Sequence, residues 1–171
     1  MVVETVKRQY GALAVDEAIP LVDGAYFDFL CTAISDGRSR VWASIFIINP
    51  IVCQDPDRKV REILKLLVAK HLLGLDVRVI VQLSKQNPEI GMVNRVTLRY
   101  LRQKDVPARP YKAAKASTHA KYVVIDDNLS VVGSHNWTHR AFSENVEDSV
   151  ALFSPSHNYQ LAREFLKVWA L

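Results

Sequence analysis

Two short runs of β-branched and aromatic residues, separated by a turn signal, most constrain the fold of this chain. The first run spans 122–125 and the second spans 129–132, with Asp126, Asp127 and Asn128 between them. Val, Ile and Tyr favour extended backbone, whereas Asp and Asn favour turns. The pattern therefore predicts a β-hairpin. A two-residue loop of Asp127 and Asn128 would pair residues whose numbers sum to about 255.

The ends of this hairpin carry side chains suited to phosphate chemistry. His119 and Lys121 are two positions apart, so they share one face of a strand. In the predicted register His119 lies opposite Asn136. Lys121 lies opposite Ser134, and Gly133 lacks a Cβ, so backbone or ligand can approach it. Imidazole is a nucleophile, lysine supplies positive charge, and hydroxyl and amide groups direct hydrogen bonds, so the pattern predicts a phosphate site.

This constellation resembles the signature of the phospholipase D superfamily, HxK-x4-D-x6-GSxN followed by an acidic residue. The matching positions are His119, Lys121, Asp126, Gly133, Ser134, Asn136 and Glu147. The resemblance covers the last third of the chain sharply. It implies a layered α/β/α sandwich with a mixed, mostly parallel sheet, and a chemistry that uses neither a metal nor a cofactor.

The resemblance also implies a role for each matched side chain. His119 would form a phosphohistidine. Lys121 and Asn136 would hold the phosphoryl oxygens with the help of Ser134. Glu147 would hold the second ring nitrogen of His119.

Asp126 belongs to the matched catalytic set, but its odd offset from His119 and its place in the turn favour a structural role. A metal site is the alternative reading of the same stretch, because His119, Asp126, His135 and Glu147 are ligand types. Lys121 would place a cation against such a metal, which disfavours this alternative.

The rest of the chain alternates strand and helix patterns. The apolar run 41–48 is typical of a strand buried on both faces, and 76–83 predicts another strand. Residues 26–35 have helical spacing, and three further helices are expected to open with a capping residue and a proline: 55–74, 87–104 and 154 to the C-terminus. Val106 and Pro107 would form a brief edge strand. This alternation predicts one α/β domain over 1–171, carrying one motif at 119–136.

Positive charge is concentrated just before the motif. Residues 95–121 hold eight basic side chains against Asp105, a balance of +7 in a chain with a net charge of +4. Basic patches attract polyanions. The residues expected to bind nucleic acid are Arg102, Arg109, Lys112 and Lys115. A solvated helix face followed by a loop would explain the same charge, and Trp137 fits either base stacking or plain packing.

The chain carries one copy of the motif, because none of its other histidines has a lysine two places on. One imidazole attacks phosphorus, and a second must protonate the departing oxygen. A chain with one copy is therefore expected to pair with a second copy around a two-fold axis. In the family that it resembles, single-motif members are dimers of this sort.

The leading hypothesis is a metal-independent phosphodiesterase, a hydrolase that cleaves DNA or RNA in the composite site of a homodimer. A phospholipase D-type lipid phosphodiesterase or phosphatidyl transferase is one alternative, and a non-catalytic nucleic-acid-binding module is another. The sequence has no obvious amphipathic membrane helix and no signal-peptide pattern. We therefore expect a cytoplasmic location and no stable membrane association.

Overall fold

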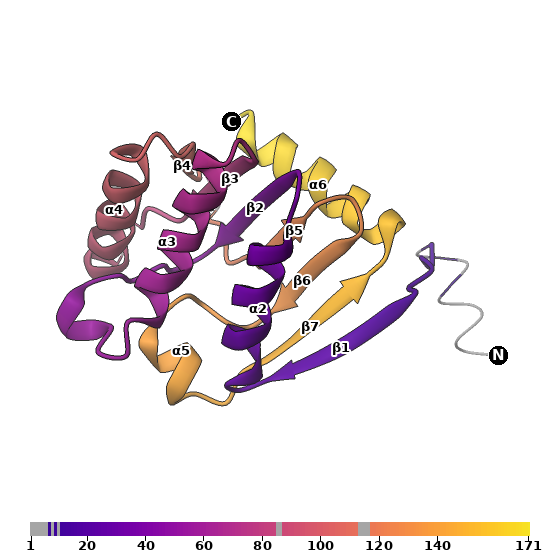
Figure 1. Cartoon of the computed structure of the whole chain (residues 1–171), viewed down its shortest axis with the longest axis horizontal. Helices are drawn as coiled ribbons and strands as arrows, with labels where there is room; N and C mark the ends of the chain where they lie inside the picture. Colours follow the sequence, from indigo (N-terminus) through magenta and orange to yellow (C-terminus); the bar gives the residue numbers. More distant parts are fainter. Residues whose placement is uncertain (1–6, 8, 10, 85–86, 113–116) are drawn as a thin grey trace.

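The computed structural model describes residues 7, 9, 11–84, 87–112 and 117–171. These residues build one seven-stranded sheet in the order β1-β7-β6-β5-β2-β3-β4 (Figure 1). The strands are β1 (Glu17–Val22), β2 (Arg40–Ile45), β3 (Asp76–Val81), β4 (Ala108–Pro110), β5 (Lys121–Ile125), β6 (Leu129–Gly133) and β7 (Asp148–Phe153). The helices are α2 (Ala25–Asp36), η1 (Val52–Gln54), α3 (Lys59–Leu72), α4 (Pro88–Arg102), α5 (His139–Ser143) and α6 (Pro155–Trp169).

The sheet is mixed, as the sequence predicts. Strand β3 pairs in parallel with both β2 and β4. The other four neighbouring pairs of the described sheet are antiparallel. Parallel neighbours need a crossover of a dozen or more residues, and only α3 and α4 provide one between adjacent strands. The prediction that the sheet is mostly parallel is therefore wrong, whereas the predicted α/β fold with a mixed sheet is confirmed.

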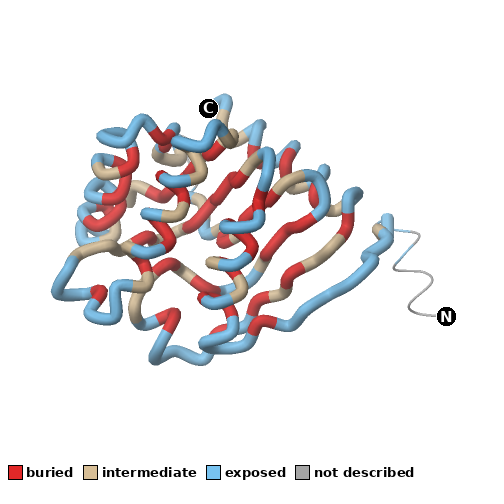
Figure 2. The backbone as a smooth tube through the Cα atoms, viewed as in Figure 1, coloured by how far each residue is buried: buried red, intermediate tan, exposed pale blue. Residues whose placement is uncertain are grey.

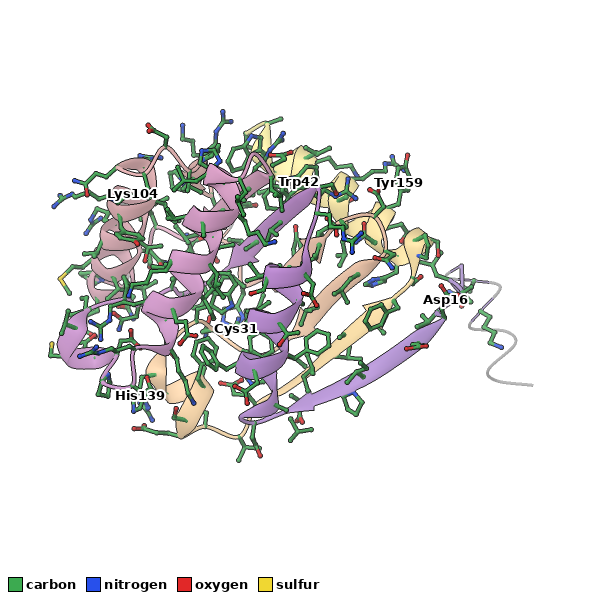
Figure 3. All side chains as sticks on the ribbon, in the orientation of Figure 1. Asp16, Cys31, Trp42, Lys104, His139 and Tyr159 are labelled. Atoms are coloured by element: carbon green, nitrogen blue, oxygen red, sulfur yellow. The ribbon has the colours of Figure 1, made fainter. Side chains whose placement is uncertain are left out.

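Helices cover both faces of the sheet, which gives the predicted α/β/α layers. Helices α2, α3 and α4 pack on one face in a large core with the inward side chains of the strands. On the other face, α6 packs Phe165 against Trp42 of β2, with ring centroids 5.3 Å apart. Trp42 is labelled in Figure 3. The central strands between the two layers are accordingly buried along most of their length (Figure 2).

Two of the predicted helix starts are confirmed, and one differs. Asn87 caps α4 by accepting from Ile90 N at 3.3 Å, and Ser154 caps α6. Helix α3 begins at Lys59 rather than beside Asp55. The fully buried Asp55 carboxylate instead accepts from the first-turn amides of the helix and from the Arg61 guanidinium, so it stabilises the same helix end from outside.

The edge strand lies two residues later than predicted. Asp105 takes a left-handed conformation with φ of 59°, and Val106 N donates to Leu101 O at 3.0 Å. These features end α4 and keep Val106 within the turn that closes the helix. Strand β4 consequently begins at Ala108.

The hairpin is confirmed, but its register differs by one residue. Ile125 faces Leu129, so the turn contains three residues, 126–128, rather than two. Asp126 has a φ of 49°, and its carboxylate accepts from the backbone amides of Arg38, Ser39 and Arg40. These hydrogen bonds, which extend the turn by one residue, connect it to the loop before β2.

Candidate active site

The matched residues other than Asp126 gather at one end of the strands, the catalytic edge, where β2 and β3 end and β5 begins. Ligand sites of α/β sheets commonly lie beyond the carboxyl ends of the parallel strands. His119 is exposed just before β5, whereas Lys121, its first residue, is 8% exposed. The chain is held there by Gln82, whose Oε1 accepts from Thr118 N at 2.8 Å.

His119 and Lys121 contact each other directly. Lys121 Nζ lies 3.1 Å from His119 Nδ1 and donates to His119 O at 2.8 Å. The Phe46 ring packs against the imidazole at 4.4 Å between centroids and lies 5.2 Å from the ammonium. Burial lowers the pKa of Lys121, and the nearby charge of Glu147 partly opposes that shift. The ammonium is thus a partly desolvated cation placed against an imidazole.

Glu147 supports Ser134 rather than the His119 ring. The Ser134 hydroxyl donates a short hydrogen bond to Glu147 Oε2, and Asn145 Nδ2 donates to Glu147 Oε1 at 2.9 Å. Among the residues that the structure describes, no hydrogen bond joins Glu147 to His119. The role expected for Glu147 at the His119 ring stays a prediction, and within one chain the carboxylate orients the serine and contributes charge near Lys121.

Asn136 is positioned by the loop that follows β2. Ile47 N donates to Asn136 Oδ1 at 3.2 Å, and backbone hydrogen bonds join Trp137 to Ile47 and Asn49. In the described part of the chain no hydrogen bond uses Asn136 Nδ2, a donor suited to a phosphoryl oxygen. Trp137 is fully buried and donates to Tyr26 Oη at 3.1 Å, so packing and not base stacking explains this tryptophan.

A buried amide on α4 joins the strand ends that hold the site, and the sequence analysis missed it. Asn94 is fully buried, accepts from Ile48 N at 2.9 Å, and donates to Phe46 O and Gln82 O at 2.8 and 2.6 Å. It therefore fixes both the segment that carries Phe46 and the residue that holds Thr118. A polar residue at a core-facing position of an amphipathic helix was the available signal.

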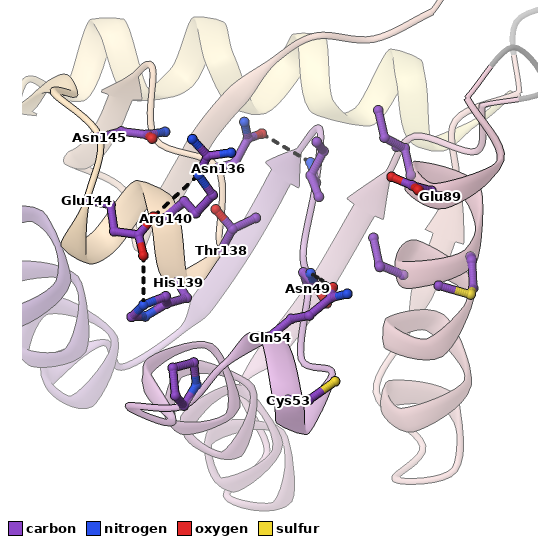
Figure 4. A pocket seen from close by; sticks show the side chains of 15 residues that line it. Asn49, Cys53, Gln54, Glu89, Asn136, Thr138, His139, Arg140, Glu144 and Asn145 are labelled. Carbon is purple, nitrogen blue, oxygen red and sulfur yellow. Dashed lines mark hydrogen bonds and ion pairs between the residues drawn. The ribbon is translucent and has the colours of Figure 1, made fainter.

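A cleft of about 820 Å³ opens beside Asn136 (Figure 4). Its walls come from the loops around Asn49 and Gln54, the first turn of α4 with Glu89, and the segment 138–145. His139 and Arg140 each contact Glu144 there, at 3.3 and 3.4 Å. The cleft is lined by neutral polar, charged and aliphatic groups. Its volume leaves room for a part of the substrate beyond the reacting group.

Asp126 and His135, a ligand type in the metal alternative, both serve the fold. Asp126 sits at the opposite end of β5 from Lys121. Burial would raise its pKa, but the hydrogen bonds from Ser39 and its neighbours hold the pKa below the usual range. His135 is fully buried, stacks on Tyr26 at 4.1 Å, and bonds Ser149 Oγ through Nδ1 at 2.7 Å. Among the described residues, no three His, Cys, Asp or Glu side chains are arranged as ligands for one metal.

The basic residues expected to bind nucleic acid have different surroundings. Arg102 Nε donates to Ala108 O at 2.9 Å. Arg109 stacks on Trp169 at 4.6 Å and donates to its carbonyl at 2.8 Å, which stabilises the end of α6. Lys112 is exposed, and Lys115 lies outside the described residues. Nucleic-acid binding by these four residues stays a prediction.

The family comparison agrees with this geometry. The family model described as "Cardiolipin synthase, PLD-like domain" matches residues 30–169. The chain belongs to the phospholipase D superfamily. Its resemblance to that family, predicted from the motif, is therefore confirmed.

Individual relatives of this phospholipase D-like chain are distant. It is 28% identical over 125 residues to a cardiolipin synthase of Geobacillus kaustophilus, which covers 72% of the chain and 23% of that protein. It is 29% identical over 99 residues to a mitochondrial cardiolipin hydrolase of Chlamydomonas reinhardtii, covering 58% of the chain and 42% of that protein. The chain thus spans about a quarter of the length of the synthases that it matches.

The fold comparison covers nearly the whole chain. Nuc, a phospholipase D family member from Salmonella typhimurium, superposes with a TM-score of 0.72 at 19% identity, over 90% of this chain and 95% of that one. The likeness confirms the predicted fold. Within the described residues, no helix has the length and apolar character needed to span a bilayer.

Proposed function

We propose that the chain is a metal-independent phosphodiesterase that cleaves nucleic acid in a site completed by a second copy of itself. The observation that carries the proposal is the placement of one exposed imidazole, His119, against the partly desolvated ammonium of Lys121. The single motif supplies one nucleophile, and the reaction needs a second group to protonate the leaving oxygen. A two-fold axis through this edge of the sheet would supply it.

The proposed mechanism has two displacements. In the first, a His119 ring nitrogen attacks phosphorus, the bond from phosphorus to the leaving oxygen breaks, and His119 of the second copy protonates that oxygen. In the second, this second imidazole takes a proton from water, which attacks phosphorus and releases His119. Lys121 and Asn136 would stabilise charge on the phosphoryl oxygens, and Ser134, oriented by Glu147, would assist.

The test is cleavage of an oligonucleotide in excess chelator by the wild type and by His119→Ala. We expect chelator to leave turnover intact and the substitution to reduce it by about 10³-fold or more. His157→Ala is the matched control, because His157 lies against Ser130 Oγ at the other end of the sheet. Loss of turnover on chelation would contradict the metal-independent mechanism.

Mixed dimers test the composite site. Wild type and His119→Ala are unfolded together in equal amounts and refolded, so that random pairing leaves about one quarter of the dimers with two imidazoles. Activity near one quarter of the wild-type value supports the shared site. Activity near one half shows that each chain works alone.

A lipid phosphodiesterase or phosphatidyl transferase is the second candidate. The family description and the Geobacillus relative carry the name cardiolipin synthase, and aliphatic Ile47, Ile90 and Met92 line the cleft beside Asn136. Phosphatidylglycerol vesicles, assayed beside the oligonucleotide under the same conditions, separate the two candidates. Faster turnover of the lipid would replace the nuclease proposal.

A further inference from the structure

A second recess lies between α4 and the edge strand β4. Its volume is about 570 Å³. It is lined by Leu83, Arg95, Leu98, Arg99, Arg102, Gln103 and Pro110. In Figure 1 α4 and β4 lie at the end of the sheet farthest from β1. The lining contains three arginines and no acidic residue.

Two of these arginines have no role within the described fold. Arg95 and Arg99 are exposed, and among the described residues their guanidinium groups have no ion-pair partner and donate no hydrogen bond. Arg102 differs, because its Nε donates to Ala108 O. Two uncompensated guanidinium groups on adjacent turns of one helix repel each other slightly, so their placement favours an anionic partner.

The apolar lining residues lie below the charges. Leu98 is 4% exposed, and Leu83 and Pro110 are half-buried, whereas all three arginines are exposed. A membrane-binding surface would need aliphatic side chains that project beyond its cations. This recess has an apolar floor and a cationic rim. Such an arrangement better suits a nucleic-acid strand whose phosphates contact the arginines and whose bases lie on the apolar floor.

The row of arginines also matches the length of a polyanion. From Arg95 to Arg102 the helix advances by about 10.5 Å, at about 1.5 Å per residue. Phosphates of one nucleic-acid strand advance by about 3.4 Å each along the axis of a duplex and by more when the strand is extended, so the row is long enough to contact two to three of them.

We propose that this recess binds single-stranded nucleic acid, with Arg95 and Arg99 on its phosphates, and delivers the strand to the catalytic edge. The inference rests on the proposed function. Leu83, which lines the recess, follows Gln82, whose side chain accepts from the amide of the residue before His119. A flexible single strand can bend into a recess of this kind, whereas a duplex is a wide and stiff rod. The proposal adds Arg95 and Arg99 to the nucleic-acid surface that the sequence predicts around Arg102.

The test uses the full chain with Arg95→Gln and Arg99→Gln combined. Binding of a fluorescent single-stranded oligonucleotide is measured by anisotropy in the His119→Ala background over a range of salt concentrations. We expect affinity to fall about tenfold, and the slope of log K against log salt to decrease by about 1.4, or 0.7 for each lost contact. In the active background, kcat/KM for the oligonucleotide should fall about tenfold relative to kcat/KM for a small chromogenic phosphodiester.

A control removes the same charge elsewhere. Arg38 and Arg163 are exposed residues outside α4, and their double substitution to Gln should leave both readouts at the wild-type level. Oligonucleotide binding by the α4 variant that equals the control overturns the inference while leaving the proposed function intact. So does a loss confined to duplex DNA or to phosphatidylglycerol vesicles. A wild type that neither binds nor cleaves nucleic acid removes the proposed function as well.

Discussion

The two ends of the β5–β6 hairpin use polar residues in opposite ways. At one end, His119 is exposed, and the Lys121 ammonium contacts its ring and its carbonyl. At the other end, the Asp126 carboxylate is saturated by amides and a hydroxyl from 38–40. The pattern H-x-K-x4-D therefore contains residues of two kinds, reactive groups at one end of a strand and a residue that stabilises the fold at the other end. Matched substitutions at the two ends can test this division.

Glycines at the two ends give the largest expected contrast in stability. A Cβ on Gly133, at the end of β6, would overlap Ser149 and lie 2.5 Å from the Asp148 carbonyl, because β7 passes directly against it. A Cβ on Gly37 would meet its nearest atoms at 3.3 Å. We expect Gly133→Ala to cost about 3 kcal/mol or more and Gly37→Ala about 1 kcal/mol or less, measured by urea unfolding. Equal losses would contradict the close approach at the catalytic edge.

Two fully buried asparagines provide the next contrast. Asn94 holds the strand ends of the site, and Asn158 accepts from Arg40 and donates to Leu129 O at the other end. Either residue changed to Leu leaves buried backbone groups unpaired, so each variant should lose about 2–3 kcal/mol of stability. Only Asn94→Leu should also lower kcat, by about tenfold or more, because Phe46 and Thr118 would shift around His119.

The readout for this pair is kcat and KM per folded molecule, with the folded fraction taken from the unfolding curves. Asn94→Leu with normal kcat would remove the positioning role. A reduced kcat in Asn158→Leu would show that the two edges are not independent.

Asp126→Asn should give the smallest effect, and it should depend on pH. The folded pKa of Asp126 lies below the unfolded value of about 3.9, so its stabilisation is present above that value and is lost as pH falls through the folded pKa. We expect a loss of about 1–2 kcal/mol at pH 7, limited by the partial exposure of the turn, and convergence with wild type near pH 2. Turnover per folded molecule should change little. A gap that persists in acid would contradict the hydrogen-bond explanation.

The sequence predicts features that arise from local pattern. The apolar run of β2, the proline-opened helices α4 and α6, and the hairpin follow from side-chain type and spacing. The register of the hairpin does not, because the turn is set by amides of 38–40, more than 80 residues away. Local spacing has no information about such a partner.

The candidate site also has features that the sequence predicts and features that only the fold reveals. The motif and the predicted hairpin bring the reactive groups together with Asn136, whereas the contact between Phe46 and His119 follows only from the fold. The expected Glu147 contact came from family resemblance and was not found within one chain, where Ser134 and Asn145 occupy both carboxylate oxygens. Asn94 carried a readable signal, a polar residue in an apolar stripe, but its three partners lie in the segments that directly follow β2 and β3.

The contact between Lys121 and the His119 ring has a consequence for protonation. A charged ammonium has only protons to offer, so the ring nitrogen facing it must present a lone pair, and a neutral ring then carries its own proton on Nε2. In that tautomer Nε2 donates a hydrogen bond and has no lone pair with which to attack phosphorus. In the proposed dimer both rings would rest in this donor form, and the symmetry between them would break when one lysine turns from its ring toward an arriving phosphate.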